Sequence, residues 1–152
     1  MSRPRAPGSV RALARWAADE RGAAVVEFAV VVPVLLTLVM AIIDFGRMIA
    51  VAASLAAAVR DGARHAATAT DLTAGGTQAQ AVQSRVVASF QAFGGAALTA
   101  GQVVVSPPDF LGNVRVSVSG YTYRPVTPIA SLAGLGTITL SRAATFRWER
   151  TL

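Results

Sequence analysis

The stretch ERGAAVVEFAVVVP, residues 20–33, decides how the rest of this chain must fold. It opens an apolar run, residues 23–43, that only Glu27, Pro33 and Thr37 interrupt. As a helix, this run spans roughly 31 Å at 1.5 Å per residue, which is enough to cross the hydrocarbon core of a bilayer. The sequence therefore predicts a transmembrane helix, and it raises the question of why a carboxylate lies inside that helix.

The composition and the charge distribution agree with a membrane protein. Hydrophobic residues make up 53% of the 152 residues and charged residues 14%, about half the charged fraction usual in soluble domains. Five of the fourteen arginines lie in residues 1–22, where only two acids oppose them. Because positive loops stay in the cytoplasm, we expect a single-pass protein of the cytoplasmic (inner) membrane. Its N-terminus would be cytoplasmic, and residues 44–152 would lie outside.

A cleaved secretory signal is the rival interpretation of the apolar run. The core of such a signal normally has 7–15 residues and ends at a small-residue site. Here the run is longer, and the nearest site of that kind, residues 50–52, follows the charged Asp44 and Arg47. The rival predicts an exported domain released near Ala53.

Two residues within the apolar run need their own explanations. Pro33 removes one helical hydrogen bond, and within a bilayer it produces a kink that neighbouring helices can accommodate. Glu27 lies about 6 Å inside the cytoplasmic end by helix rise, from where its side chain could reach the headgroups. An acid in a spanning helix can equally mark a functional partner. Position alone leaves both explanations of Glu27 open.

The chain beyond the membrane predicts an α+β fold, with the long N-terminal helix packed on a small antiparallel sheet. The helix should continue to about residue 68, because apolar residues recur there every three or four positions. That stripe consists of Phe45, Met48, Ile49, Ala52, Leu55, Val59 and Ala63. On another side of the helix, Arg60 and Arg64 are like charges that Asp61 partly offsets.

Turn signals and alternation place the remaining elements. We expect a turn at 71–77 and a second helix at 78–93, with Val82, Val86, Phe90 and Phe93 on one face. Alternating patterns predict three strands, at 102–106, 113–124 and 137–149. The phase of the second changes at Gly120, which indicates a bulge. The connection 124–136 could hold a short helix opened by Thr127 and Pro128.

These patterns divide the chain into four parts. They are a basic leader (1–22), a transmembrane helix (23–43), the extracytoplasmic continuation of that helix (44–68) and a small α+β domain (69–152).

The sequence gives little support to an enzyme. His65 is the only histidine, there is no cysteine, and the eight acids have no metal-ligand spacing. No phosphate-binding loop or nucleophile motif is present. The arginines after residue 22 are scattered, and they show no interleaving with aromatic residues. We therefore expect no catalytic activity, no metal, no cofactor, no nucleic-acid partner and no small-molecule substrate.

A glycine followed five residues later by glutamate, after a basic leader, is the type IV prepilin pattern. The stretches RGAAVVEFAVVVPVLLTLVMAIIDFGR (21–47) and AAVRDGARHAA (57–67) narrow it further. They resemble the TadE/TadG-like minor pilins, or pseudopilins, of tight-adherence (type IV pilus) secretion systems. One departure is that the family often has glutamate where this chain has Asp44 and Asp61.

The resemblance implies cleavage by a prepilin peptidase between Gly22 and Ala23, which would make Glu27 the fifth mature residue. It implies that Glu27 and Phe28 serve subunit assembly. The new α-amino group of Ala23, with an ordinary pKa of about 7.7–8.0, would be a natural partner for the Glu27 carboxylate of an adjacent subunit. The residues implied in helix packing or in an acidic-Phe-Gly turn are Pro33, Asp44, Phe45, Gly46, Arg47, Arg60, Asp61, Gly62 and Arg64.

The expected function is that of a minor pilin or pseudopilin, a structural component that acts by subunit assembly and can enter a cell-surface pilus. Expected partners are the membrane, the prepilin peptidase, the major and other minor pilins, and the tight-adherence assembly platform. One alternative is an unprocessed membrane-anchored scaffold protein of the same machinery, and another is an exported ligand-binding domain. The mature N-terminal residue separates them: Ala23 for the pilin, Met1 or Ser2 for the scaffold, and a residue near Ala53 for the exported domain.

Overall fold

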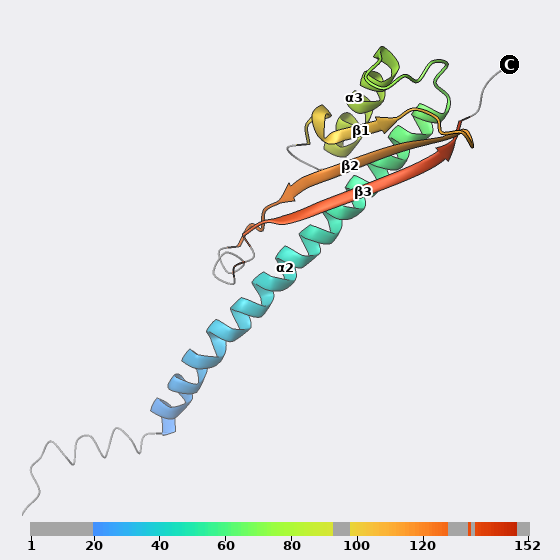
Figure 1. Ribbon diagram of the computed structural model, residues 1–152. Helices are drawn as coiled ribbons and strands as arrows, with labels where there is room; N and C mark the ends of the chain where they lie inside the picture. The colour runs from blue at the N-terminus through green and yellow to red at the C-terminus, as the bar shows by residue number, and fades with distance from the viewer. Residues whose placement is uncertain (1–19, 93–97, 128–133, 135, 149–152) are drawn as a thin grey trace, which may run out of the picture. The chain divides into compact units, whose positions relative to one another are not determined.

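The computed structural model describes residues 20–92, 98–127, 134 and 136–148. Figure 1 shows a long helix followed by a second helix and a small sheet. The elements are α2 (Glu20–Ala67), α3 (Thr77–Ala92), the 3-10 helix η1 (Ala100–Gln102), β1 (Val103–Ser106), β2 (Asn113–Tyr123) and β3 (Ile138–Arg147). The predicted α+β fold is confirmed. Phe93 and the predicted short helix from Pro128 lie outside the described residues.

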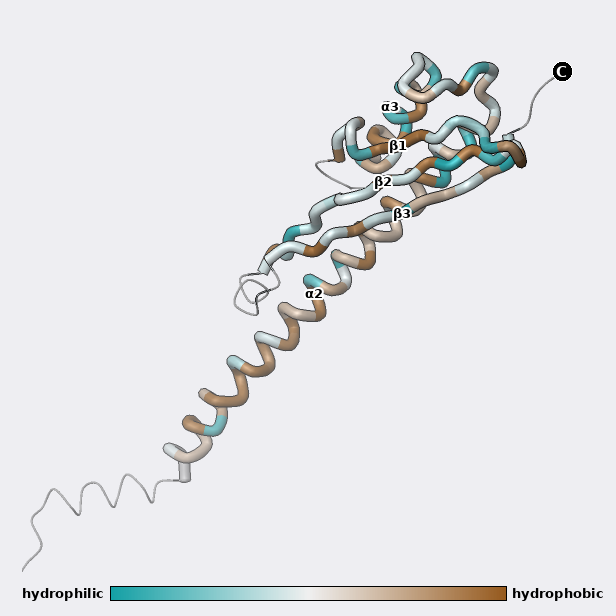
Figure 2. The backbone as a smooth tube through the Cα atoms, viewed as in Figure 1, coloured by the Kyte–Doolittle hydropathy of each residue, from teal (hydrophilic) through white to brown (hydrophobic). Residues whose placement is uncertain are grey.

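The chain divides into two compact units, residues 1–42 and 43–152. The described part of the first unit is the N-terminal half of α2, here called the anchor segment (residues 20–42). Its large apolar side chains are exposed, from 38% at Met40 to 70% at Phe28, and Figure 2 colours this half of α2 mostly as hydrophobic. The helix continues through Pro33, whose carbonyl accepts a hydrogen bond from the Thr37 hydroxyl at 2.7 Å.

The second unit, here called the folded unit (residues 43–152), begins within α2. The helix face turned to the core carries residues spaced by three or four positions. They are Asp44, Met48, Val51, Leu55, Ala58, Gly62 and Ala66. The expected stripe was therefore wrong at its start, since Phe45 and Ile49 are 61% and 51% exposed. Polar Asp44 and the small Ala58 and Gly62 mark the true face, and a search for large apolar residues overlooks them.

The second helix packs closely on the end of α2. Val82, Val86 and Phe90 are fully buried, which confirms their predicted face. A Cβ atom added at Gly62 would overlap Cγ2 of Val86, so α3 approaches α2 where α2 has no side chain. Phe90 also meets the ring of Tyr121 edge to face, with centroids 5.2 Å apart. This geometry is favourable for aromatic pairs.

The sheet is antiparallel with the order β1-β2-β3. Alternate residues of β2 face the core, and Val114, Val116 and Val118 are buried. The register shifts between Val118 and Tyr121, where Gly120 adopts a φ of 74°. The bulge predicted at Gly120 is thereby confirmed, and it keeps valines and tyrosines on the same buried face.

Two hydrogen bonds of the folded unit hold the sheet to α2 and to the chain directly after it. The Tyr123 hydroxyl donates to the main-chain carbonyl of Asp44 at 3.2 Å. The Trp148 indole Nε1 donates to the Ala69 carbonyl at 2.7 Å. Because Tyr123 pairs with Ile138 at the start of β3, that strand begins beside residue 44 and ends beside residue 69. β3 therefore runs in the same direction as α2.

The two glycines of α2 in the folded unit predict opposite effects of the same substitution. Gly62→Ala should lower the free energy of unfolding, because overpacking against Val86 costs about 1–3 kcal/mol and the gain in helix propensity offsets only about 1 kcal/mol. Gly46→Ala should raise it by up to about 1 kcal/mol, since nothing lies within 4 Å of the added Cβ. Thermal unfolding of the full chain in detergent, followed by near-UV circular dichroism, measures both. A stabilising Gly62→Ala would contradict the close helix contact.

Candidate functional site

The residues expected to serve function lie in three places on α2. The predicted cleavage site and Glu27 lie in the anchor segment, Asp44 lies at the start of the folded unit, and residues 60–64 lie near the end of the helix. These places do not form one common site within the described residues. Each has its own geometry.

In the anchor segment, the Gly22–Ala23 bond lies within the first turn of α2, which begins at Glu20. The side chains of Glu27 and Phe28 are exposed, and the large side chains around them are apolar. Within the described residues, no cation forms a salt bridge with Glu27. An isolated carboxylate on an apolar helix surface requires a partner if that surface is placed in a low-dielectric environment.

At the start of the folded unit, the Asp44 carboxylate collects hydrogen bonds from the chain that follows β2. Oδ1 accepts from the backbone N–H of Val126 at 2.9 Å, and both oxygens accept from the backbone N–H of Thr127 at 3.3 Å. The Thr127 hydroxyl also donates to Oδ2. We call this group, together with the Tyr123 hydroxyl on the Asp44 carbonyl, the Asp44 clamp.

The clamp gives a buried charge the donors that it requires. Asp44 is only 8% exposed, and among the described residues it is the one charged residue that is buried. Hydrogen bonding by the Thr127 hydroxyl, and then by the backbone of Val126 and Thr127, holds the pKa of Asp44 below its ordinary value of 3.8. The carboxylate therefore remains ionised at neutral pH, and it stabilises the position of residues 126 and 127.

The neighbours of Asp44 differ from the expected turn. The chain remains helical through Phe45, Gly46 and Arg47, and these three residues are exposed. The acidic-Phe-Gly element is thus not a turn in this chain. Its acid faces the core, because it lies one helical turn before Met48 on the buried line, while its other residues face away.

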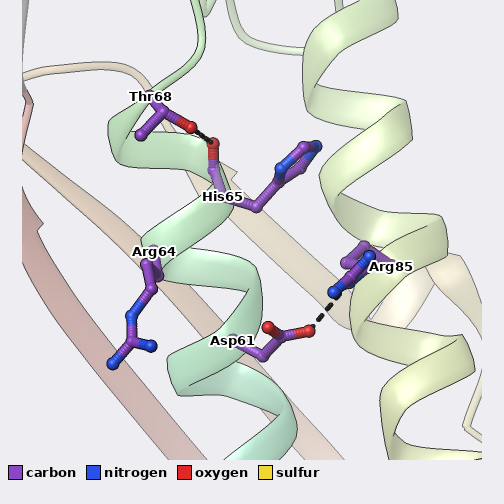
Figure 3. A pocket seen from close by; sticks show the side chains of 5 residues that line it. All are labelled: Asp61, Arg64, His65, Thr68 and Arg85. Carbon is purple, nitrogen blue, oxygen red and sulfur yellow. Dashed lines mark hydrogen bonds and ion pairs between the residues drawn. The ribbon is translucent and has the colours of Figure 1, made fainter.

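Near the end of α2, Asp61 links the two helices. Its Oδ2 accepts hydrogen bonds from Arg85 Nε at 2.9 Å and from the Ser89 hydroxyl at 2.6 Å. These bonds, from Arg85 first, lower the pKa of Asp61. Arg64, whose charge Asp61 was expected to offset in part, points away from this pair in the pocket shown in Figure 3. A residue of α3, distant in sequence, supplies the counter-ion instead.

The other two residues of this group have different surroundings. Arg60 is exposed on the helix surface, whereas Gly62 is buried against Val86. In the sequence RDGAR, Asp61, which pairs with Arg85, is therefore followed directly by Gly62, which lets α3 approach α2.

Sequence reasoning missed three residues that position the sheet on α2: Tyr123, Thr127 and Trp148. Each uses a polar side-chain atom that alternation patterns ignore. A tyrosine hydroxyl or an indole N–H that becomes buried usually finds a hydrogen-bond partner. This rule predicts that hydrogen-bond acceptors lie near Tyr123 and Trp148, but it does not identify them.

The described residues hold no cluster of three or more histidines, cysteines, aspartates or glutamates that could bind a metal ion. The arrangement provides an exposed apolar helix, a buried carboxylate clamp and an ion pair between helices. Such features attach one part of a protein to another. They also provide surfaces on which another molecule can pack.

Residues 22–64 match the family model of the TadE-like protein. This TadE-like segment lies wholly within α2 and contains Glu27, Asp44 and Asp61. The resemblance to TadE/TadG-like pilins is thereby confirmed for the helix. No curated protein and no solved structure matches the chain.

The TadE-like segment also meets the requirements of a membrane span. The helix from Gly22 to Ala67 is long and apolar enough to cross a bilayer, by its length and composition. Its most apolar part is exposed in the anchor segment. The segment is therefore consistent with a single-pass membrane anchor.

The Asp44 clamp predicts a specific dependence of stability on pH. Because the folded-state pKa of Asp44 is lowered, its contribution is complete above the unfolded value of 3.8 and is lost as pH falls through the folded-state pKa. Asp44→Asn should lower the melting temperature at pH 7, and the gap to wild type should narrow at pH 3. Thermal melts at pH 7, 5 and 3 measure this gap. Asp71→Asn, the same change at an exposed site, is the control, and a constant gap for Asp44→Asn would exclude a role of the charge.

Proposed function

We propose that this chain is a minor pilin or pseudopilin of a tight-adherence system and that it acts by subunit assembly and not by catalysis. The observation that carries the proposal is the exposed apolar surface of the anchor segment, which bears one carboxylate. The TadE-like match over residues 22–64 supports it. In this proposal the anchor segment lies in the cytoplasmic membrane, with the leader inside and the folded unit outside.

The proposed assembly step begins with removal of the leader. A prepilin peptidase would cut between Gly22 and Ala23 and create a positive α-amino group at the start of the apolar helix. The Glu27 carboxylate of a neighbouring subunit would pair with that amine. Glu27 is exposed and has no ion-pair partner within the described part of its own chain, which suits contact with another molecule.

The unprocessed scaffold protein is the second candidate. It is favoured by the start of α2 at Glu20, because the predicted cleavage bond then lies inside a helix. A protease must open that turn before it can cut. The mature N-terminal residue distinguishes the two candidates, since the scaffold keeps Met1 or Ser2.

Processing is tested by co-expression with a cognate prepilin peptidase. We expect the chain to lose 22 residues and to begin at Ala23, as measured by intact mass. Gly22→Val should block the cut, because it adds a side chain at the residue directly before the cleaved bond, where the family pattern has glycine. Gly46→Val, the same substitution later in α2, should be cut normally. An uncut wild-type chain would favour the scaffold.

Assembly is tested with Glu27→Gln, which keeps the side chain's shape and removes its charge. The variant should insert and be processed but should fail to co-purify with the major and minor pilins. Leaving the partner ammonium unpaired in a low-dielectric layer costs about 3–5 kcal/mol, which corresponds to more than about a hundredfold in association.

Glu27→Asp keeps the charge and is the matched control, for which we expect substantial assembly. Wild-type association of Glu27→Gln would mean that the carboxylate merely reaches the headgroups, and the pairing would have to be abandoned.

A further inference from the structure

Within the described residues, the sheet of the folded unit has one long edge without a partner strand. β3 pairs with β2 on one side, and no described strand pairs with its other side. Alternate backbone N–H and C=O groups of an edge strand point away from the sheet, which makes such an edge a template for another strand.

The two edges of the sheet differ in how well they are protected. β1 has four residues and is followed by Pro107 and Pro108, which have no N–H to donate. β3 has ten residues and contains neither proline nor glycine. Short strands, prolines and inward-pointing charges are common protections against edge pairing. β3 is neither short nor interrupted by proline, and the protection that it does carry is a charged residue in its core-facing row.

The core-facing side chains of β3 are less covered than their partners on β2. Ala144 and Phe146 are half-buried, whereas their register partners Val116 and Val114 are fully buried. Ile138 and Leu140 are likewise half-buried. The apolar side chains of this row are therefore less buried on β3 than on β2. One more strand beside β3 would cover it.

A charged residue stands in the middle of this row. Arg142 lies opposite Val118 in the register and is exposed. Its Nη1 donates to the neighbouring Ser141 carbonyl at 2.9 Å. Within the described residues Arg142 forms no salt bridge, since the ion pair there joins Arg85 and Asp61. Neither β2 nor β3 contains an acidic residue. A strand with a carboxylate between apolar residues would complement Arg142, because Arg–carboxylate contacts are strong and directional.

A second copy of β3 does not supply the carboxylate that Arg142 lacks, because β3 contains no acidic residue. Pairing of two β3 strands would instead bring a second Arg142 to the same edge, and like charges across paired strands are destabilising.

We propose that the free edge of β3 binds an extended segment of a different protein, which pairs as a fourth strand and places a carboxylate against Arg142. Backbone hydrogen bonds supply the general affinity of such strand addition, and alternate side chains supply its selectivity. The recognised pattern is an alternating strand with an acidic residue between apolar residues on its core-facing side. Arg142 is then the residue that selects the partner.

The test uses the full chain in detergent micelles and two labelled synthetic peptides. The first is Val-Thr-Val-Thr-Glu-Thr-Val-Thr-Val, and the second has lysine in place of glutamate. By fluorescence anisotropy, the glutamate peptide should bind wild type about tenfold or more tightly than the lysine peptide, because opposite charges across strands attract and like charges repel. Arg142→Ala should remove this difference, and Arg142→Glu should reverse it. Equal affinities for wild type, or no saturable binding, would overturn the proposal.

Location is tested by disulfide trapping, since the chain has no cysteine. A peptide with one added cysteine should crosslink to Ala143→Cys on β3 and not to Val104→Cys, which is also an exposed position but lies on β1. Crosslinking at Val104→Cys alone, or homodimers of Ala143→Cys that exclude the peptide, would contradict this assignment. Neither readout depends on processing at Gly22 or on assembly through Glu27, so a failure here is distinguishable from a failure of the proposed function.

Discussion

The folded unit depends on the need of one buried carboxylate for hydrogen-bond donors. Asp44 stands on the core-facing line of α2, where an unpaired charge would be strongly unfavourable. Those donors are the backbone N–H groups of Val126 and Thr127 and the Thr127 hydroxyl. The clamp itself contains no cation. The chain leaving β2 must therefore pass beside residue 44, and this requirement sets where the next strand can start. The position of the sheet along the helix follows from that contact.

A single helix satisfies two different environments in succession. In the anchor segment, apolar side chains cover the whole helix surface and are exposed in the isolated chain. In the folded unit, one face of the helix is buried, and most of its residues near the end of the helix are small, among them Ala58, Gly62 and Ala66. The TadE-like match covers both environments and ends at residue 64. Within the matched helix, the acid at residue 44 contacts the later part of the chain, which the match does not include.

Much of the fold follows from local sequence patterns. Length and hydropathy identify α2, period-two alternation identifies β2 and β3, and the phase change at Gly120 identifies the bulge. These signals are contained within a few neighbouring residues. The partners of Asp44 and Asp61 are not, because they come from segments 82 and 24 positions away. Phe45 was misplaced for a related reason: its apolar character suggests burial, but the core selected the face that carries Asp44.

The parallel run of β3 and α2 has a mechanical consequence. The sheet is hydrogen-bonded to the helix at residue 44 and to the chain just beyond the helix at residue 69, with strands aligned between these points. A pulling force applied along this part of the helix would load the β2–β3 hydrogen bonds in shear, so that many bonds share the load and must yield together. A sheet fastened at one end only would open one bond at a time. The geometry therefore lets the sheet resist tension along this part of the helix without opening from one end.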